Sequence, residues 1–302
     1  MKKTIIAIVI VILVVVGIYF LVTKFSNKVV LTNDQTVATT TATTATTTAT
    51  STLENKAQMV IGKSTQGRDI MAYNYGTGET KLLFIGGIHG GYEWNTVLLA
   101  QKTMDYLKAN PETIPANVKV TVIPVMNPDG LFKVVGTTGS FTQADVLASK
   151  VDTTLGRFNA NNVDLNRNFD CDWQTTGMWQ NKTVSGGSEA FSETESQAVR
   201  RYIETESPEA VVVWYSASGG VFSSSCHNGV LPETKKLTNA YAKASGYPAF
   251  EEFNFYEITG DMVNWLAKEN VSAISVLLTN HTDIEWTKNL AGIQALLKYY
   301  TK

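Results

Sequence analysis

The pattern of apolar and polar positions divides the chain into three parts. Residues 4–23 carry no charged side chain and consist mostly of Ile and Val. As a helix rising 1.5 Å per residue, this segment would be about 30 Å long, the thickness of a bilayer core. Residues 31–52 are rich in Thr and Ala and have no apolar periodicity. After residue 57, short apolar runs alternate with helical patterns, as expected of a globular domain.

The charges that flank the apolar segment suggest an orientation. Lys2 and Lys3 precede it together with the terminal amine, and Lys24 and Lys28 follow it. This slight bias favours a cytoplasmic N-terminus. We therefore expect residues 1–28 to form a cytoplasmic N-terminus and a transmembrane signal anchor. The alternative is a cleaved signal peptide, although such apolar regions usually have about 7–15 residues.

The two remaining parts have different expected roles. The Thr/Ala-rich residues 29–56 cannot form an apolar core, so we expect a flexible stalk. Residues 57–302 are long enough for one large core, and we expect a single extracytoplasmic domain of a single-pass membrane protein.

The domain's apolar runs predict an α/β fold. Runs that suit buried strands lie at residues 81–88, 118–125, 210–215 and 273–278, and helical patterns lie at about 92–109, 234–245, 260–269 and 284–300. Ser192 and Glu195 have the spacing of a capping box that opens another helix, ending near Glu206. We expect a central mixed, mostly parallel sheet flanked by helices, with ligands at the carboxyl ends of its strands.

Composition narrows the range of partners. Five of the 25 basic residues and two of the 27 acidic ones precede residue 57, so the domain carries a net charge of −5. An acidic domain without a basic cluster argues against nucleic acid. Cys171 and Cys226 are too few for a disulfide scaffold. In an exported domain we expect them to form one disulfide, and the alternative is two free, buried thiols.

Candidate chemistry follows the predicted strands. His89 and Glu93 lie in the Gly-rich segment 86–94, after the first strand, as a weak candidate metal pair. Residues 127–130 (NPDG) follow the second strand, where we expect a turn. Two Arg and two Asn then fall on short loops, and an Arg guanidinium suits a carboxylate or a polarised carbonyl; these are Arg157, Asn159, Asn166 and Arg167.

Together these segments resemble the zinc metallocarboxypeptidases, the carboxypeptidase A-like family. The resemblance runs in collinear order over about residues 59–301. The most specific segment is VDLNRNF at 163–169, and the others are Gly62-Lys63-Ser64 with Gly67-Arg68, HGGYE at 89–93, NPDG, the AFSE segment at 190–193, YEITG at 256–260 and LTNHTD at 278–283.

The resemblance implies a role for each matching residue. His89 and Glu93 match the first two zinc ligands, although three residues rather than two separate them. Arg157 matches the arginine that polarises the scissile carbonyl. Asn166 and Arg167 match the pair that binds the substrate's terminal carboxylate. Tyr256 matches the tyrosine that closes over bound substrate, and Asp261 and Val263 fall near the specificity-pocket positions.

Two positions depart from the family pattern. Tyr215 stands where the third zinc ligand, a His, is expected, and a phenol must lose a proton of pKa about 10 to bind as phenolate. Leu277 stands where the catalytic Glu is expected and cannot accept a proton. Zinc binding should therefore be weakened or absent. His281 and His227 are the other histidines that could compensate.

The sequence supports three functional hypotheses. The first is a membrane-anchored, carboxypeptidase-like protein that binds the C-terminus of a peptide or a peptidoglycan peptide with catalysis impaired or lost. The second is an active zinc exopeptidase with atypical ligands. The third is a non-catalytic adhesion or structural ectodomain. Whether the protein is an enzyme is left open by the residues.

Overall fold

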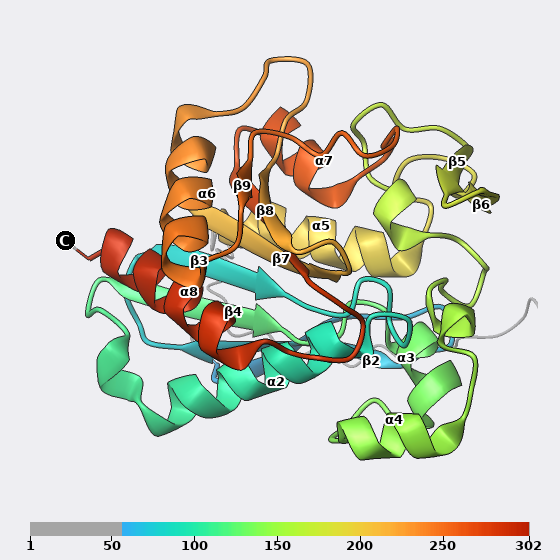
Figure 1. Ribbon diagram of the computed structural model, residues 1–302, viewed down its shortest axis with the longest axis horizontal. Coiled ribbons are helices and arrows are strands. Elements are labelled where there is room, and N and C mark those ends of the chain that lie inside the picture. The colour runs from blue at the N-terminus through green and yellow to red at the C-terminus, as the bar shows by residue number, and fades with distance from the viewer. Residues whose placement is uncertain (1–55, 302) are drawn as a thin grey trace, which may run out of the picture. The chain divides into compact units, whose positions relative to one another are not determined.

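A mixed sheet of eight strands forms the centre of the domain. The computed structural model describes residues 56–301 (Figure 1). The strands lie in the order β1-β2-β4-β3-β7-β10-β8-β9. Their bounds are β1 Gln58–Lys63, β2 Asp69–Tyr75, β3 Thr80–Ile85, β4 Val118–Ile123, β7 Ala210–Ser216, β8 Gly220–Ser223, β9 Ala249–Phe250 and β10 Ser272–Leu278.

The four predicted strands form the middle of this sheet. They are β4, β3, β7 and β10, which are adjacent and mutually parallel. The outer pairs β1–β2, β2–β4 and β10–β8 are antiparallel. The predicted α/β fold with a mixed sheet flanked by helices is therefore confirmed for the domain. Strands β1, β2, β8 and β9 were not predicted, because they are short or lie at the edges and lack long apolar runs.

Helices cover both faces of the sheet. One face packs on α2 (Trp94–Ala109), α6 (Pro232–Ser245) and α8 (Trp286–Tyr299), and the other on α5 (Thr194–Glu206) and α7 (Met262–Lys268) (Figure 1). In β3, Leu82 and Phe84 pack on the first layer, whereas Leu83 and Ile85 pack on the second. This alternation is the two-residue period of a strand that is buried on both faces.

Smaller elements form the loops around the sheet. They are the helices α3 (Pro128–Val135) and α4 (Gln143–Ser149), the hairpin β5 (Thr176–Trp179) and β6 (Lys182–Ser185), and the 3₁₀ turns at Pro111–Thr113, Thr153–Gly156 and Leu165–Arg167.

Two local predictions were wrong. The NPDG segment opens helix α3 rather than a turn, because Asn127 Oδ1 accepts a hydrogen bond from the Gly130 N–H and Pro128 suits the first helical turn. The capping box is absent. Helix α5 begins after Glu193, which makes no side-chain cap, and the Ser192 hydroxyl donates to Glu193 Oε1 instead.

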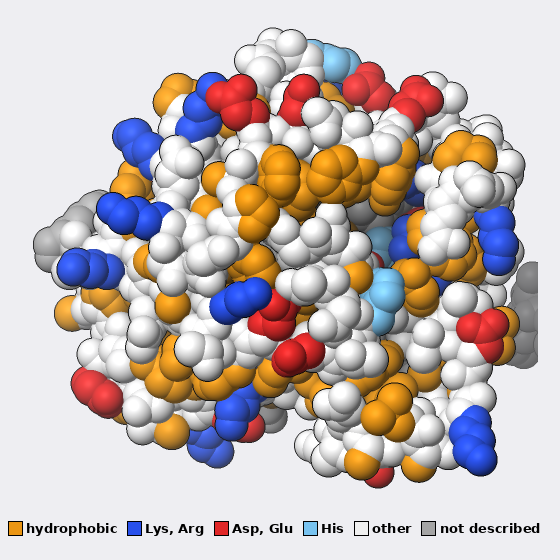
Figure 2. Space-filling view, viewed as in Figure 1, with side chains coloured by type: hydrophobic (Ala, Val, Ile, Leu, Met, Phe, Trp, Pro, Cys, Tyr) orange, Lys and Arg blue, Asp and Glu red, His pale blue; other side chains and the backbone are white. Residues whose placement is uncertain are grey.

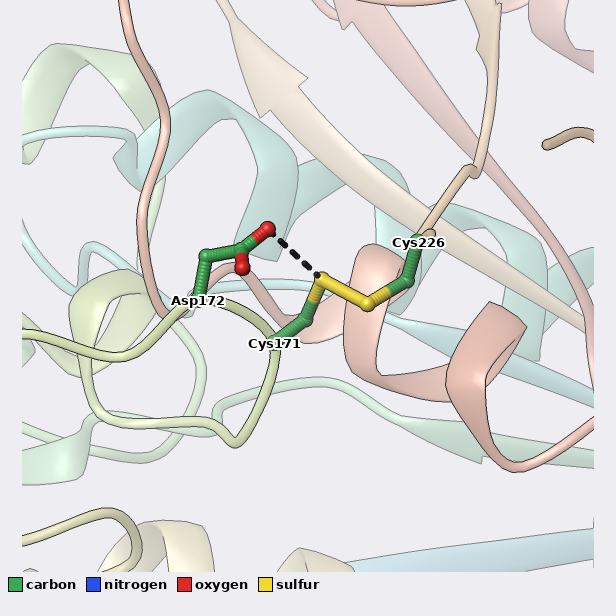
Figure 3. Close-up of side chains that lie close together, drawn as sticks. All are labelled: Cys171, Asp172 and Cys226. Atoms are coloured by element: carbon green, nitrogen blue, oxygen red, sulfur yellow. Dashed lines mark hydrogen bonds between the residues drawn. A yellow bond between two sulfur atoms is a disulfide. The ribbon is translucent and has the colours of Figure 1, made fainter. Parts of the chain in front are cut away.

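The predicted disulfide is present. Cys171 and Cys226 are bonded, with Cα atoms 6.3 Å apart (Figure 3). Asp172 lies beside Cys171, and the three side chains are close enough to suggest a metal cluster. Since thiolate is the form that binds metal, the bonded sulfurs leave no metal site there.

The predicted membrane segment, residues 4–23, and the stalk, residues 29–56, lie outside the described residues except for Lys56. Among residues 56–301, no helix is long and apolar enough to cross a membrane.

Candidate active site

The predicted site residues gather around one cleft with a volume of about 310 Å³. It opens at the carboxyl ends of β3, β7 and β10. Figure 2 shows histidine side chains in a hollow of the face drawn, with hydrophobic side chains along its rim. The lining includes the eight residues that the resemblance places at ligand, catalytic or substrate-binding positions: His89, Glu93, Arg157, Asn166, Arg167, Tyr215, Tyr256 and Leu277. Asn159 is not part of the lining, and its amide donates to Glu193 Oε2 (2.7 Å) instead.

A Gly-rich turn between β3 and α2 positions His89 and Glu93. Residues 88–93 form consecutive turns, and Glu93 is the residue that precedes α2. Gly90 has φ +44, and a Cβ there would lie 2.8 Å from the Gly156 carbonyl oxygen, so the turn needs glycine. Three residues separate His89 from Glu93, one more than the family spacing. The two side chains still meet, since His89 Nδ1 lies 3.0 Å from Glu93 Oε1.

An ion-pair network holds the other side of the His89 ring. His89 Nε2 lies 3.1 Å from Asp164 Oδ1, and the second oxygen of Asp164 accepts hydrogen bonds from Arg157 Nε (3.1 Å) and Nη2 (2.7 Å). Burial alone would raise the pKa of Asp164, but Arg157 and His89 hold it well below its ordinary value. Burial and the Arg157 charge lower the pKa of His89, whereas Glu93 and Asp164 raise it, with a net increase. Arg157 is thus fixed in the cleft wall by Asp164.

Tyr215 lies beside His89 but is engaged elsewhere. The two ring centroids are 5.9 Å apart. The Tyr215 hydroxyl donates to Asn166 Oδ1 (3.1 Å), and Asn166 Nδ2 donates to Asp261 Oδ2 (2.8 Å). Burial, reinforced by the charges of Asp261 and Glu93, raises the pKa of Tyr215 well above its ordinary value. The phenol is therefore held as a neutral hydrogen-bond donor.

Arg167 is a buried cation that forms no direct ion pair among the described residues, although the charges of Asp164 and Asp261 act on it at longer range. It is 2% exposed, and Nη1 and Nη2 donate to the carbonyl oxygens of Asn166 (3.0 Å) and Met178 (3.1 Å). Within residues 56–301, no carboxylate oxygen lies within 4.0 Å of it, and its Nε has no hydrogen-bond partner there. The Tyr256 ring lies 5.9 Å from its guanidinium carbon and is 45% exposed at the cleft rim.

Leu277 contributes an apolar surface to the cleft. It lies on β10, directly beside Tyr215 on β7 in the parallel register. It is 9% exposed and belongs to the core cluster that includes Tyr215 and Phe222. Nothing at this position can take up a proton.

The zinc that the resemblance implies fits only part of this site. Glu93 Oε2 is buried and has no hydrogen-bond partner among the described residues. His89 Nδ1 makes no hydrogen bond there either, although it lies 3.0 Å from Glu93 Oε1, and both atoms suit metal donors. The phenol of Tyr215 does not fit, because its proton is donated to Asn166 and its pKa is raised. The third donor that a zinc site needs is thus missing from the predicted position.

Sequence reasoning missed Asp164 and the hydrogen-bonding part played by Asp261. Asp164 lies in the VDLNRNF segment, and its position near Asn166 and Arg167 could have indicated that it belongs to the site. Asp261 begins α7, where its Oδ1 accepts from the Asn264 N–H (3.0 Å). Its contact with Asn166, 95 residues away in sequence, could not be read from the chain.

Comparison with known proteins identifies the family and the fold. The pattern of the zinc carboxypeptidase family, peptidase M14, matches residues 45–291. Carboxypeptidase Z from Gallus gallus is 32% identical over 122 residues, which are 36% of this chain and 18% of that protein. The carboxypeptidase N catalytic chain from Homo sapiens is 24% identical over 184 residues, 57% of this chain and 37% of that protein. The chain thus spans less than half of the length of these relatives.

Solved structures show the same fold. The murein-tripeptide amidase MpaA from Escherichia coli O157 has a TM-score of 0.58 and 22% identity, covering 82% of this chain and 94% of that one. Carboxypeptidase A from Helicoverpa armigera has a TM-score of 0.60 and 18% identity, covering 80% of this chain and 66% of that one. Because the family pattern covers most of the sequence, this chain belongs to the zinc carboxypeptidase family.

Proposed function

We propose that the cleft binds the free C-terminus of a peptide and that hydrolysis by the family's usual route is impaired. The domain would do so outside the cytoplasm, anchored to the membrane through residues 4–23. The observation that carries the proposal is that buried Arg167 has no directly paired carboxylate among the described residues.

A buried cation without a counter-ion is costly, because desolvation of the charge is not offset. Arg167 contacts two carbonyl oxygens and a ring but no carboxylate. A ligand carboxylate in the cleft would complete its coordination with short, charge-assisted hydrogen bonds. This is the role that the family resemblance implies for the same residue.

The charges of the remaining groups favour a carboxylate over a cation. Asp164 is paired with Arg157, and Asp261 accepts from Asn166 and from the α7 N-terminus. Burial also raises the pKa of Asp261, which makes its charge easier to lose. The positive charge of Arg167 is therefore the one that a ligand meets. Tyr256, which is exposed and lines the cleft, would cover such a ligand.

Impaired catalysis is supported by the two departures from the family pattern. Removal of a general base typically costs about 10²–10⁴-fold in rate, and Leu277 offers no base. Tyr215 holds its proton, so it does not supply the charge of a third zinc ligand. The buried Oε2 of Glu93, which has no hydrogen-bond partner among the described residues, and the neighbouring Nδ1 of His89 favour a second candidate, an active exopeptidase that completes its metal site with an atypical ligand.

The ligand is proposed to be a peptide or a peptidoglycan peptide. The murein-tripeptide amidase neighbour supports the latter, which would also suit the proposed extracytoplasmic location. The acidic net charge of the domain gives no support to nucleic acid as a partner.

Calorimetric titration of the full-length protein with a peptide acid and the same peptide as its amide tests the proposal. We expect the acid to bind at least tenfold more tightly, and we expect Arg167→Gln to abolish this preference. Arg201→Gln, the same change at an exposed position of α5, is the matched control and should leave the preference intact. Equal binding of acid and amide by the parent would leave the adhesion or structural alternative.

A further inference from the structure

A chain of hydrogen bonds fixes the protonation of His281, which lies after β10 and lines the cleft. It begins at Asn95, a fully buried residue of α2. Both hydrogens of the Asn95 amide are donated to backbone carbonyls, one to Asn280 (2.8 Å) and one to Asp283 (3.0 Å). Since carbonyl oxygens only accept, these contacts fix the orientation of the amide and leave Oδ1 as an acceptor.

The next link is Ser216, at the end of β7. Its Oγ lies 3.1 Å from Asn95 Oδ1 and 2.8 Å from His281 Nδ1. Asn95 Oδ1 has no hydrogen, so the single hydroxyl hydrogen of Ser216 must point at it. The contact with His281 then requires a hydrogen on Nδ1, which is donated to Ser216 Oγ.

This tautomer leaves the lone pair of His281 on Nε2. In a neutral imidazole with a protonated Nδ1, the other nitrogen is an acceptor. No described residue donates to Nε2, and the ring is partly exposed in the cleft wall. The ring also packs on Tyr92, with centroids 4.5 Å apart, which fixes its plane.

Burial and the neighbouring charges favour the neutral form of His281. Burial lowers its pKa, and the charges of His89 and Arg157 lower it further, while Glu93 alone raises it. These are the titratable and charged groups that face it from the Gly-rich turn and from the Arg157 loop. An imidazole that is neutral, oriented and accessible has the properties of a general base.

We propose that His281 Nε2 is the proton acceptor of this cleft, in the place of the carboxylate that Leu277 lacks. The inference rests on the proposed binding of a peptide C-terminus. Water attacks the carbonyl carbon of the last peptide bond and gives its proton to Nε2. When the C–N bond breaks, the imidazolium returns that proton to the nitrogen of the leaving residue. The products are the shortened peptide, with a new carboxyl group, and the free C-terminal amino acid.

Ser216 has a positioning role in this scheme, because it holds the Nδ1–H and so keeps the lone pair on Nε2. Its own partner, Asn95, keeps the hydroxyl from donating to the ring. The arrangement is that of a base oriented by a third group through its other nitrogen. Leu277, four residues earlier, supplies only the apolar wall.

The test uses the full-length protein at a concentration above that of a peptide acid, so that a single slow turnover is measured. The variant is His281→Gln, and the matched control is His227→Gln, an exposed histidine paired with Asp172 at the disulfide. We expect His281→Gln to lower the residual rate by about 10²-fold or more and His227→Gln to leave it unchanged. Calorimetric affinity for the peptide acid should be the same in both.

Two further readouts separate a base from a structural residue. The parent rate should fall as the pH drops through a pKa below 6.5, and this inflection should vanish in His281→Gln. Long-range ¹H–¹⁵N NMR, assigned by comparison with His281→Gln, should show Nδ1 protonated and Nε2 bare.

Three results would overturn the inference: no release of the terminal residue by the parent, equal rates for the parent and His281→Gln, or a protonated Nε2 at neutral pH. If the peptide acid still binds in preference to its amide, these results contradict the role of His281 and leave the proposed binding function standing. Loss of that preference would instead contradict the proposed function itself.

Discussion

The hydroxyl of Tyr215 donates a 3.1 Å hydrogen bond to Oδ1 of Asn166. One residue occupies the position of an expected metal ligand and the other that of an expected substrate-binding amide. Because Asn166 Oδ1 also accepts from the Met262 N–H (3.2 Å), its amide is fixed by Tyr215, Asp261 and α7 together. The replacement at position 215 therefore bears on ligand binding as well as on metal binding.

Removal of this hydrogen bond should destabilise the domain. We expect Tyr215→Phe to lower the free energy of unfolding by about 1 kcal/mol, the usual net value for one hydrogen bond. Urea denaturation followed by tryptophan fluorescence measures the change. Tyr73→Phe is the control, because the Tyr73 hydroxyl has no hydrogen-bond partner within residues 56–301. Equal stability of the parent and Tyr215→Phe would show that the bond is not formed in solution.

A histidine at position 215 should restore the third zinc ligand. Neutral imidazole binds zinc without first losing a proton, whereas the Tyr215 phenol has a raised pKa. We expect Tyr215→His to retain close to one zinc per chain after dialysis and the parent to retain markedly less, as measured by plasma mass spectrometry. His89→Ala added to Tyr215→His should remove the bound zinc. Full zinc occupancy in the parent would contradict the assignment of Tyr215 as a defective ligand.

The disulfide should contribute substantially to stability. Cys171 and Cys226 are 55 residues apart, and closing a loop of this size restricts the unfolded chain by about 4 kcal/mol in the chain-entropy account. We expect the free energy of unfolding of the Cys171→Ser, Cys226→Ser double variant to be lower than that of the parent by about 2–5 kcal/mol. The comparison is between the unfolding midpoints of the parent, the reduced parent and the variant. A reduced parent as stable as the oxidised one would contradict this expectation.

Glu285 should make stability depend on pH in the acid range. Burial raises the pKa of Glu285, but Lys288 and the Thr279 N–H lower it to about 2 in the folded protein. The unfolded pKa is about 4.3, so the contribution is present above that value and is lost as the pH falls through about 2.

We therefore expect Glu285→Gln to lower the free energy of unfolding by about 1 kcal/mol at pH 7, since solvent screens this partly exposed group, and we expect the difference from the parent to shrink between pH 4 and pH 2. Urea denaturation across this range measures it. Glu204→Gln removes an exposed ion pair with Arg200, and this variant should lose little stability at any pH. A loss from Glu285→Gln that does not change with pH would mean that packing, and not charge, is responsible.

The sequence was most informative where burial is continuous along the chain. The four central strands could be predicted because strands buried on both faces read as unbroken apolar runs, as in AVVVWY before Ser216. The start of α5 could not be predicted in this way. Ser192 has the sequence pattern of a helix cap, but its hydroxyl donates a hydrogen bond to Glu193 Oε1 instead. Local patterns of this kind lose to tertiary contacts that the sequence does not reveal.

The same distinction applies to the site. Family motifs placed His89, Arg157, Asn166 and Arg167 at one cleft, and the structure brings them together. The partners that fix their states come from distant segments, such as Asp261 on Asn166 and Asn95 behind Ser216. Donor and acceptor roles at Tyr215 and His281 follow only from those contacts, so they could not be predicted from the chain.

The most direct test of impaired catalysis is the rate at which the parent releases a C-terminal residue, compared with that of the Tyr215→His, Leu277→Glu double variant. We expect the parent to be slower by several orders of magnitude, because its base and its third metal ligand depart from the family pattern, and we expect the double variant to recover activity in the intact cleft. Such effects need not multiply, so either single change should recover little. A parent that turns over peptides at about 1–10³ per second, the ordinary range for enzymes, would contradict the account.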